Sequence, residues 1–152
     1  MYYQFKQEQK LHCSIEEAWD FATSPKNLKE ITPKFMLFEI TSDNENDKIY
    51  PGMIISYKVA PIFNIKMNWV TEITQVCENK FFIDEQRLGP YKMWHHQHFF
   101  EDRKSFVVMK DIVTYIPPYG ILGDSFNKFY LKKELQNIFE FRKLAMNQKF
   151  NS

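Results

Sequence analysis

The chain has 152 residues, 44% hydrophobic and 26% charged, a composition typical of one soluble globular domain rather than a disordered chain. The net charge is +1 and no long basic run occurs, so we expect no binding to nucleic acid through phosphate contacts. Aromatic residues make up 17% of the chain, which predicts an interior that is bulky or built around another molecule.

The two cysteines, Cys13 and Cys77, lie far apart and outside any CxxC motif. This spacing argues against a zinc ribbon or a redox dithiol and suits a reducing compartment. The N-terminal stretch is polar and alternating, and no apolar run reaches the roughly 20 residues of a membrane helix. We expect a single domain over residues 1–152, located in the cytoplasm, with no membrane span.

The first elements in chain order are a strand and two short helices. Apolar and polar residues alternate over 3–11, which predicts a strand with one inward face. Ser14 and Glu17 then form a capping-box pattern, and apolar residues at positions 15, 18, 19 and 22 give the following helix one apolar face. Ser24-Pro25 starts a second short helix that ends near Thr32-Pro33.

Six strand-like stretches follow, separated by turn signals, at about 34–41, 53–60, 65–76, 80–88, 92–101 and 105–116. The segment 116–124 reads as a loop, and one long helix begins at Asp124 or Ser125 and continues to the end. Its apolar residues do not keep to one face, so we expect it to contact two different parts of the protein. Short turns between consecutive strands predict an α+β protein: an antiparallel sheet of seven strands curled around this long helix.

The hairpin turns predict which residues of the central strands share a face. A two-residue turn at Glu78-Asn79 pairs Val76 with Phe81 and Ile73 with Asp84. The next turn, Gly89 to Tyr91, pairs Leu88 with Lys92 and Asp84 with His96. A two-residue turn at Arg103-Lys104 pairs Phe100 with Val107 and His96 with Asp111.

This register places polar residues on the inward, largely apolar face of the sheet. The inward set contains our candidate ligand-binding residues: Met67, Trp69, Asp84, Gln86, Trp94, His96, His98, Phe100, Met109, Asp111 and Tyr115. Leu88 also falls in the inward set, and His95 and Gln97 fall outside it. Burying polar groups is costly unless they find partners, so the inward polar residues must bond each other, water or a ligand.

Four interpretations of these polar residues remain open. His96 and His98 could be core histidines bonded to Asp111 and to backbone groups. They could instead border a cavity for an amphipathic small molecule, which we rank first. A His-x-His pair with Asp84 or Asp111 could hold zinc, but two histidines are weak evidence and we expect no metal and no cofactor. His96 flanked by Asp111 could also act as a general base, which makes these two the catalytic candidates.

The chain contains the motifs F-x-D-x-Q (82–86), GPY, W-x-H-x-H-x-F (94–100), D-x-V-x-Y-x-P (111–117), G-x-L-G and IFEFR. Together they resemble a subfamily of the START-like (SRPBCC) superfamily close to the polyketide cyclase/dehydratase group. The resemblance covers nearly the whole chain and implies the helix-grip fold, with an internal cavity between the sheet and the C-terminal helix. It implies a cavity role for Trp94, His96, His98, Phe100 and Asp111.

The resemblance implies no particular reaction, because one fold hosts many functions. The first hypothesis is binding of a small hydrophobic or amphipathic molecule that is lipid-like, aromatic or polyketide-like. The second is a cyclase or dehydratase that uses His96 with a carboxylate. The third is a protein-interaction module with a filled cavity. Phe99, on the outward face, adds an apolar contact surface, and a homodimer is among the assemblies that such a surface allows.

Overall fold

A computed structural model describes residues 1–118 and 125–152. The predicted loop at 116–124 and the predicted cap at Asp124 lie mostly outside these residues. The elements in chain order are β1 (Tyr3–Leu11), α1 (Ile15–Ala22), η1 (Pro25–Lys29), η2 (Lys34–Met36), β2 (Glu39–Ile40), β3 (Ile54–Val59), β4 (Met67–Cys77), β5 (Phe81–Leu88), β6 (Met93–Asp102), β7 (Val107–Ile116), η3 (Asn127–Leu131) and α3 (Lys132–Phe150).

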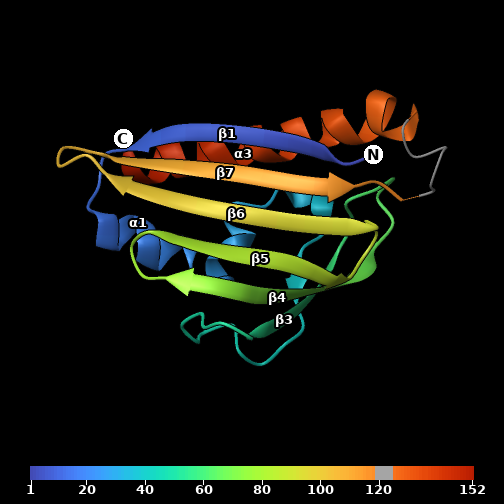
Figure 1. The fold of residues 1–152 in the computed structure, drawn as a ribbon, viewed down its shortest axis with the longest axis horizontal. Coiled ribbons are helices and arrows are strands. Elements are labelled where there is room, and N and C mark those ends of the chain that lie inside the picture. Colours follow the sequence, from blue (N-terminus) through green and yellow to red (C-terminus); the bar gives the residue numbers. More distant parts are fainter. Residues whose placement is uncertain (119–124) are drawn as a thin grey trace.

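The strands form one antiparallel sheet in the order β1-β7-β6-β5-β4-β3-β2, as expected from consecutive hairpins. The first strand completes the sheet by pairing with the last, Phe5 opposite Val113. Helices α1 and α3 lie on the same face of the sheet, and α3 runs behind β1 and β7 (Figure 1). The inward residues of the central strands therefore face helices rather than solvent. No helix within the two described ranges is long and apolar enough to cross a membrane.

Helix α1 begins as its sequence predicts. The backbone N–H of Glu17 donates to the Ser14 hydroxyl (3.2 Å), and the backbone N–H of Ser14 donates to the Glu17 carboxylate (2.9 Å). Both halves of the capping box are thus formed. The helix buries Ala18, Trp19 and Phe21; Trp19 packs on Phe82 and Phe100 of the sheet, and Phe21 packs on Phe150 of α3.

The predicted strand at 34–41 is wrong over most of its length. Residues Lys34–Met36 form the 3-10 turn η2, and only Glu39–Ile40 pair with the sheet. Leu37 between them has a left-handed backbone (φ 50°), which breaks an extended segment. Met36 is buried and its carbonyl accepts a hydrogen bond from Ala60 N (2.6 Å), so tertiary contacts override the strand propensity here.

The C-terminal helical segment contacts two parts of the protein, as predicted from its two apolar faces. On one side Leu131, Leu135 and Phe139 are buried beneath the sheet. On the other side Tyr130 stacks on Phe63 (centroids 4.6 Å apart), and its hydroxyl accepts a hydrogen bond from Phe63 N (3.0 Å). The π-helical turn η3 precedes α3, so the helix is wider over Asn127–Leu131, the stretch that contains both Tyr130 and Leu131.

Phe139 is fully packed, whereas Phe129 on the same helical segment is 77% exposed. We expect Phe139→Ala to lower the free energy of unfolding by about 3–5 kcal/mol, because it removes a buried ring and leaves a void. Phe129→Ala is the matched control and should change it by less than about 0.5 kcal/mol. Urea unfolding followed by circular dichroism measures both; equal losses would show that Phe139 is not part of the core.

Candidate functional site

Two histidines and two aspartates meet on the inward face of the sheet. His96 and His98 come from β6, Asp84 from β5 and Asp111 from β7. His96 Nε2 lies 3.0 Å from Asp111 Oδ1, and His98 Nε2 lies 2.8 Å from Asp84 Oδ2. We call these four residues the His–Asp cluster. All four side chains are at most 16% exposed, so they bond each other in an environment that contains little water.

The inward orientation of the cluster confirms the predicted parity. His96, His98 and Phe100 alternate as buried positions along β6, and His95 pairs outward with Glu85 (Nδ1 to Oε1, 2.8 Å). Asp84 lies opposite His96, as predicted.

The predicted pairing of His96 with Asp111, and of Phe100 with Val107, is wrong by two residues. The turn after β6 spans residues 103–106 rather than two central residues, so Asp111 lies opposite His98, and Val113 lies opposite His96. A shift of two residues keeps every side chain on its predicted face, since alternation has a period of two. Asp111 reaches His96 diagonally and still forms the predicted bond.

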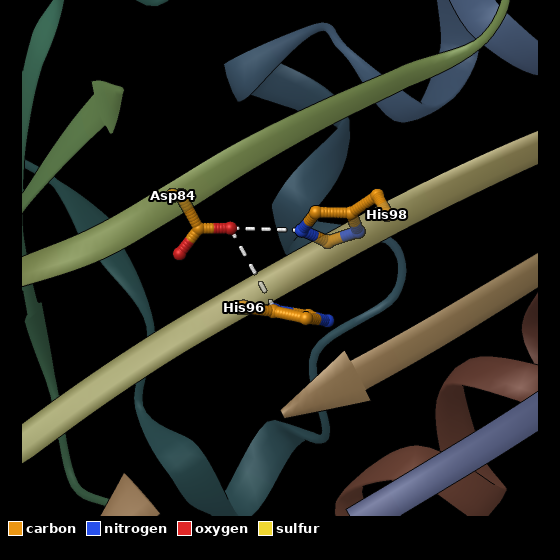
Figure 2. A group of neighbouring side chains, drawn as sticks. All are labelled: Asp84, His96 and His98. Carbon is orange, nitrogen blue, oxygen red and sulfur yellow. Dashed lines mark hydrogen bonds and ion pairs between the residues drawn. The ribbon is translucent and has the colours of Figure 1, made fainter. Parts of the chain in front are cut away.

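Asp111 contacts both histidines through one oxygen. His98 Nδ1 is also 3.0 Å from Asp111 Oδ1, but the nitrogen is not aligned with that oxygen for a formed hydrogen bond, so this contact is electrostatic. The opposite nitrogens of the two rings face Asp84. His96 Nδ1 lies 3.6 Å from Asp84 Oδ2, the same oxygen that His98 contacts (Figure 2). Ligand atoms of Asp84, His96 and His98 lie within 4.8 Å of one another, close enough to hold a metal ion.

The cluster gives its two histidines different protonation behaviour. Burial, together with the charge of His98, lowers the pKa of His96 to about 4. Burial also opposes the charged form of His98, but its contacts with Asp111 and Asp84 raise its pKa above the usual value. Burial likewise opposes ionisation of the carboxyls, yet the histidines hold the pKa values of Asp84 and Asp111 below their usual range. Below the ordinary pKa of histidine, at pH 6, the favoured state has two carboxylates, a charged His98 and a neutral His96.

Aromatic rings fix the orientation of the imidazoles. His98 stacks on Phe82 with centroids 4.0 Å apart and an angle of 11° between the planes. His96 meets the edge of Phe139 from α3 at 5.6 Å. These contacts leave each ring little freedom to rotate, so the nitrogens that face Asp84 and Asp111 are set by packing as well as by hydrogen bonds.

A cavity of about 150 Å³ lies between the inward face of the sheet, the helices and the segment 22–38. Six of the predicted site residues line it: Trp69, Asp84, Trp94, His96, His98 and Met109. Its other walls are mostly apolar and include Ile31, Met36, Ile55, Leu135 and Phe139. The polar atoms of the cluster thus border a mainly hydrophobic space.

The other five predicted site residues do not line this cavity. Asp111 lies behind the histidines, and Phe100 packs on Trp19 (5.4 Å) in a separate part of the core. The Tyr115 hydroxyl donates to Asn127 Oδ1 (2.7 Å). Met67 is half-buried at the start of β4 and outside the lining.

Gln86 has a structural role instead. Its side chain donates to Tyr91 O (2.7 Å) and accepts from Tyr91 N (3.2 Å), which holds the turn at Gly89. A Cβ at Gly89 would lie 2.4 Å from Gln86 Oε1, so a larger residue there would displace the Gln86 side chain from these hydrogen bonds.

A second polar group, formed by Tyr57, Trp69 and Thr71, lies on the cavity wall and was not predicted from the sequence. The Thr71 hydroxyl accepts a hydrogen bond from Trp69 Nε1 (3.1 Å) and lies 2.9 Å from the Tyr57 hydroxyl. Burial, and then the nearby charge of Asp84, raise the pKa of Tyr57 far above its usual value, so it stays protonated. Thr71 is buried on the same face of β4 as Trp69, and Tyr57 belongs to β3, whose register was not predicted.

Arg142 on α3 is a further cavity residue that was not predicted. It lines the cavity, its guanidinium lies over the Phe139 ring (5.0 Å), and its buried Nε has no hydrogen-bond partner among the described residues. The signal was present in the sequence, because Arg142 follows Leu135, Ile138 and Phe139 on the same helical face, at i+7 from Leu135.

No protein-family model matches the chain, and a search of curated proteins finds no match. Solved structures do share its fold. Ara h 8.0201 aligns with a TM-score of 0.62 at 15% identity, over 97% of this chain and 99% of its own. Major latex-like protein 151 from Panax ginseng aligns with a TM-score of 0.66 at 6% identity, over 98% and 97%. TTHA0849 from Thermus thermophilus aligns with a TM-score of 0.68 at 15% identity, over 96% and 95%.

At these identities the likeness shows the fold alone. The alignments span nearly the full length of both partners, and the seven-stranded sheet with its long C-terminal helix matches the expectation from the START-like resemblance. The chain therefore has the helix-grip fold.

We expect the two buried histidines to titrate separately. In chelator-treated protein at pH 6, NMR of the ring nitrogens should show a neutral His96 and a protonated His98, because the pKa of His96 is lowered to about 4 and that of His98 is raised. His96→Gln and His98→Gln assign the signals. Two histidines that both titrate near the ordinary value of about 6.5 would show that the rings are not held between the two aspartates.

Proposed function

We propose that the protein binds a small amphipathic molecule in the cavity between its sheet and α3. The observation that carries this proposal is the composition of the cavity wall. Apolar side chains form most of it, while Asp84, His96 and His98 border it at one place, and Tyr57 and Arg142 line it as well. Apolar walls with a few convergent polar groups are typical of small-molecule sites.

The size of the cavity narrows the ligand class. Its volume is about 150 Å³, similar to that of an apolar cavity that holds a benzene ring. This suits a compact molecule with one or two rings better than a long acyl chain. Among the expected lipid-like, aromatic and polyketide-like ligands, the volume favours the aromatic and the smaller polyketide-like ones.

Polar groups on the wall favour a ligand that carries hydrogen-bonding or acidic substituents. The Arg142 guanidinium has a buried donor without a partner among the described residues, and an acidic group of a ligand would satisfy it. The hydroxyls of Tyr57 and Thr71 can bond a neutral oxygen.

The geometry supports binding over the other two hypotheses. A filled interior, as expected for a protein-interaction module, does not agree with a cavity of this volume. Base catalysis by His96 is disfavoured at neutral pH, because its pKa is lowered to about 4 and its Nε2 is already bonded to Asp111.

Native mass spectrometry of the full chain, purified from the producing cells, should show a bound small molecule. Ile138→Trp fills the cavity from α3 and should abolish the bound mass, whereas Leu144→Trp, 60% exposed on the same helix, should retain it. Both variants should give the circular dichroism spectrum of the parent.

Titration of the extracted molecule back into the protein provides an independent readout. Trp69 and Trp94 line the cavity and Trp19 does not, so binding should quench most of the fluorescence that remains in a Trp19→Phe variant. In the mass spectrometry experiment, equal retention of the bound molecule by Ile138→Trp and Leu144→Trp would contradict the proposal.

A further inference from the structure

The two histidines of the His–Asp cluster have a consistent arrangement of nitrogens. His96 Nδ1 and His98 Nε2 both face Asp84 Oδ2, at 3.6 and 2.8 Å. The remaining nitrogens, His96 Nε2 and His98 Nδ1, both lie 3.0 Å from Asp111 Oδ1. One carboxylate therefore faces the near side of both rings, and a second carboxylate faces the far side.

We propose that Asp84, His96 and His98 bind a divalent transition-metal ion, with Asp111 as the outer carboxylate that orients both imidazoles. Histidines that bind metals usually donate their second ring N–H to a carboxylate or carbonyl, which fixes the ring and strengthens the nitrogen ligand. Asp111 is buried and does this for His96, and the same oxygen lies 3.0 Å from His98 Nδ1, where a small rotation of either side chain would align a second hydrogen bond. The site goes beyond ligand binding in the cavity and does not depend on it.

The distances fit a small ion after a modest adjustment. Ligand atoms at about 2.0–2.1 Å from a tetrahedral zinc ion lie roughly 3.4 Å from one another. The two nitrogen-to-Asp84 distances, 2.8 and 3.6 Å, bracket this value, and all three ligand atoms lie within 4.8 Å of one another. Small rotations of the imidazoles and of the Asp84 carboxylate would bring the three atoms onto one ion.

The hydrogen bonds favour a cation at this point. His96 Nε2 must carry a proton to donate to the Asp111 carboxylate, so in the neutral ring Nδ1 holds a lone pair. That lone pair faces Asp84 Oδ2 at 3.6 Å without a hydrogen bond to it. In the metal-free protein the proton on His98 Nε2 forms the hydrogen bond to Asp84 Oδ2 next to this lone pair. A metal ion in place of that proton would bond His98 Nε2, Asp84 Oδ2 and His96 Nδ1.

The donor set indicates the class of metal. Two imidazoles and one carboxylate suit Zn²⁺, Fe²⁺ or Co²⁺ rather than Mg²⁺ or Ca²⁺, which prefer oxygen ligands. Asp84, His96 and His98 all line the cavity, so a three-ligand site would keep an open position toward it. An oxygen atom of a bound molecule could fill that position.

Zinc binding to the full chain tests the proposal. Protein made without a histidine tag and stripped with a chelator should take up one equivalent of Zn²⁺ in competition with a chromophoric chelator. His98→Ala and Asp84→Ala each remove a ligand and should weaken binding at least 100-fold. The matched control is His95→Ala, on the same strand with its side chain paired outward to Glu85, which should leave the affinity unchanged.

Asp111→Asn tests the orienting role, because it keeps the volume and removes the charge. It should keep the one-to-one stoichiometry and weaken Zn²⁺ binding by about 10–100-fold. Circular dichroism of each variant separates loss of binding from loss of fold. Failure of the folded parent protein to take up Zn²⁺ or Co²⁺, or an equal loss of affinity in His95→Ala, would overturn the proposal, whatever the outcome for the cavity ligand.

Discussion

The polar part of the candidate site depends on a carboxylate, Asp111, that is buried beneath the sheet and faces two histidines. A buried carboxylate without a partner would cost several kcal/mol, and the register in which β6 and β7 pair brings His96 and His98 to it as partners. That register also directs Asp84 to the near side of the same rings. The polar part of the cavity wall, which contains the candidate metal ligands, therefore lies where the buried Asp111 carboxylate has its partners.

The faces of the strands could be predicted, because face depends only on parity. The two-residue error in the predicted register of β6 and β7 was harmless for this reason. The turn after Cys77 contains one more residue than predicted, so Val76 pairs with Phe82, but an irregularity between Ile73 and Gln75 restores the predicted pairing of Ile73 with Asp84. An irregularity at the other end of β5 had no compensation, so Leu88, predicted to point inward, is 57% exposed.

The cavity boundary could not be predicted from strand alternation. It depends on how closely α3 and the segment 22–38 approach the sheet, and these are tertiary distances that no local pattern encodes. Phe100 faces inward as predicted but packs in a separate part of the core, and Tyr115 faces inward but lines a different pocket, next to Tyr3 and Phe5. Arg142 and Tyr57 come from other elements and join the cavity wall only in the folded chain. Asp111 was predicted as a site residue from its charge and its inward face, although the residue opposite it on β6 is His98 rather than the predicted His96.

The central claim is that the His–Asp cluster exists for binding rather than for folding. Buried ionic groups can often be replaced by apolar residues without loss of stability, whereas removal of one partner is costly. The direct test is the free energy of unfolding of a variant in which Asp84, His96, His98 and Asp111 are all leucine, measured by urea unfolding beside the parent protein. The account predicts a value that is unchanged or higher by about 1–4 kcal/mol. A decrease of several kcal/mol would show that the cluster is needed for the fold itself and would contradict the account.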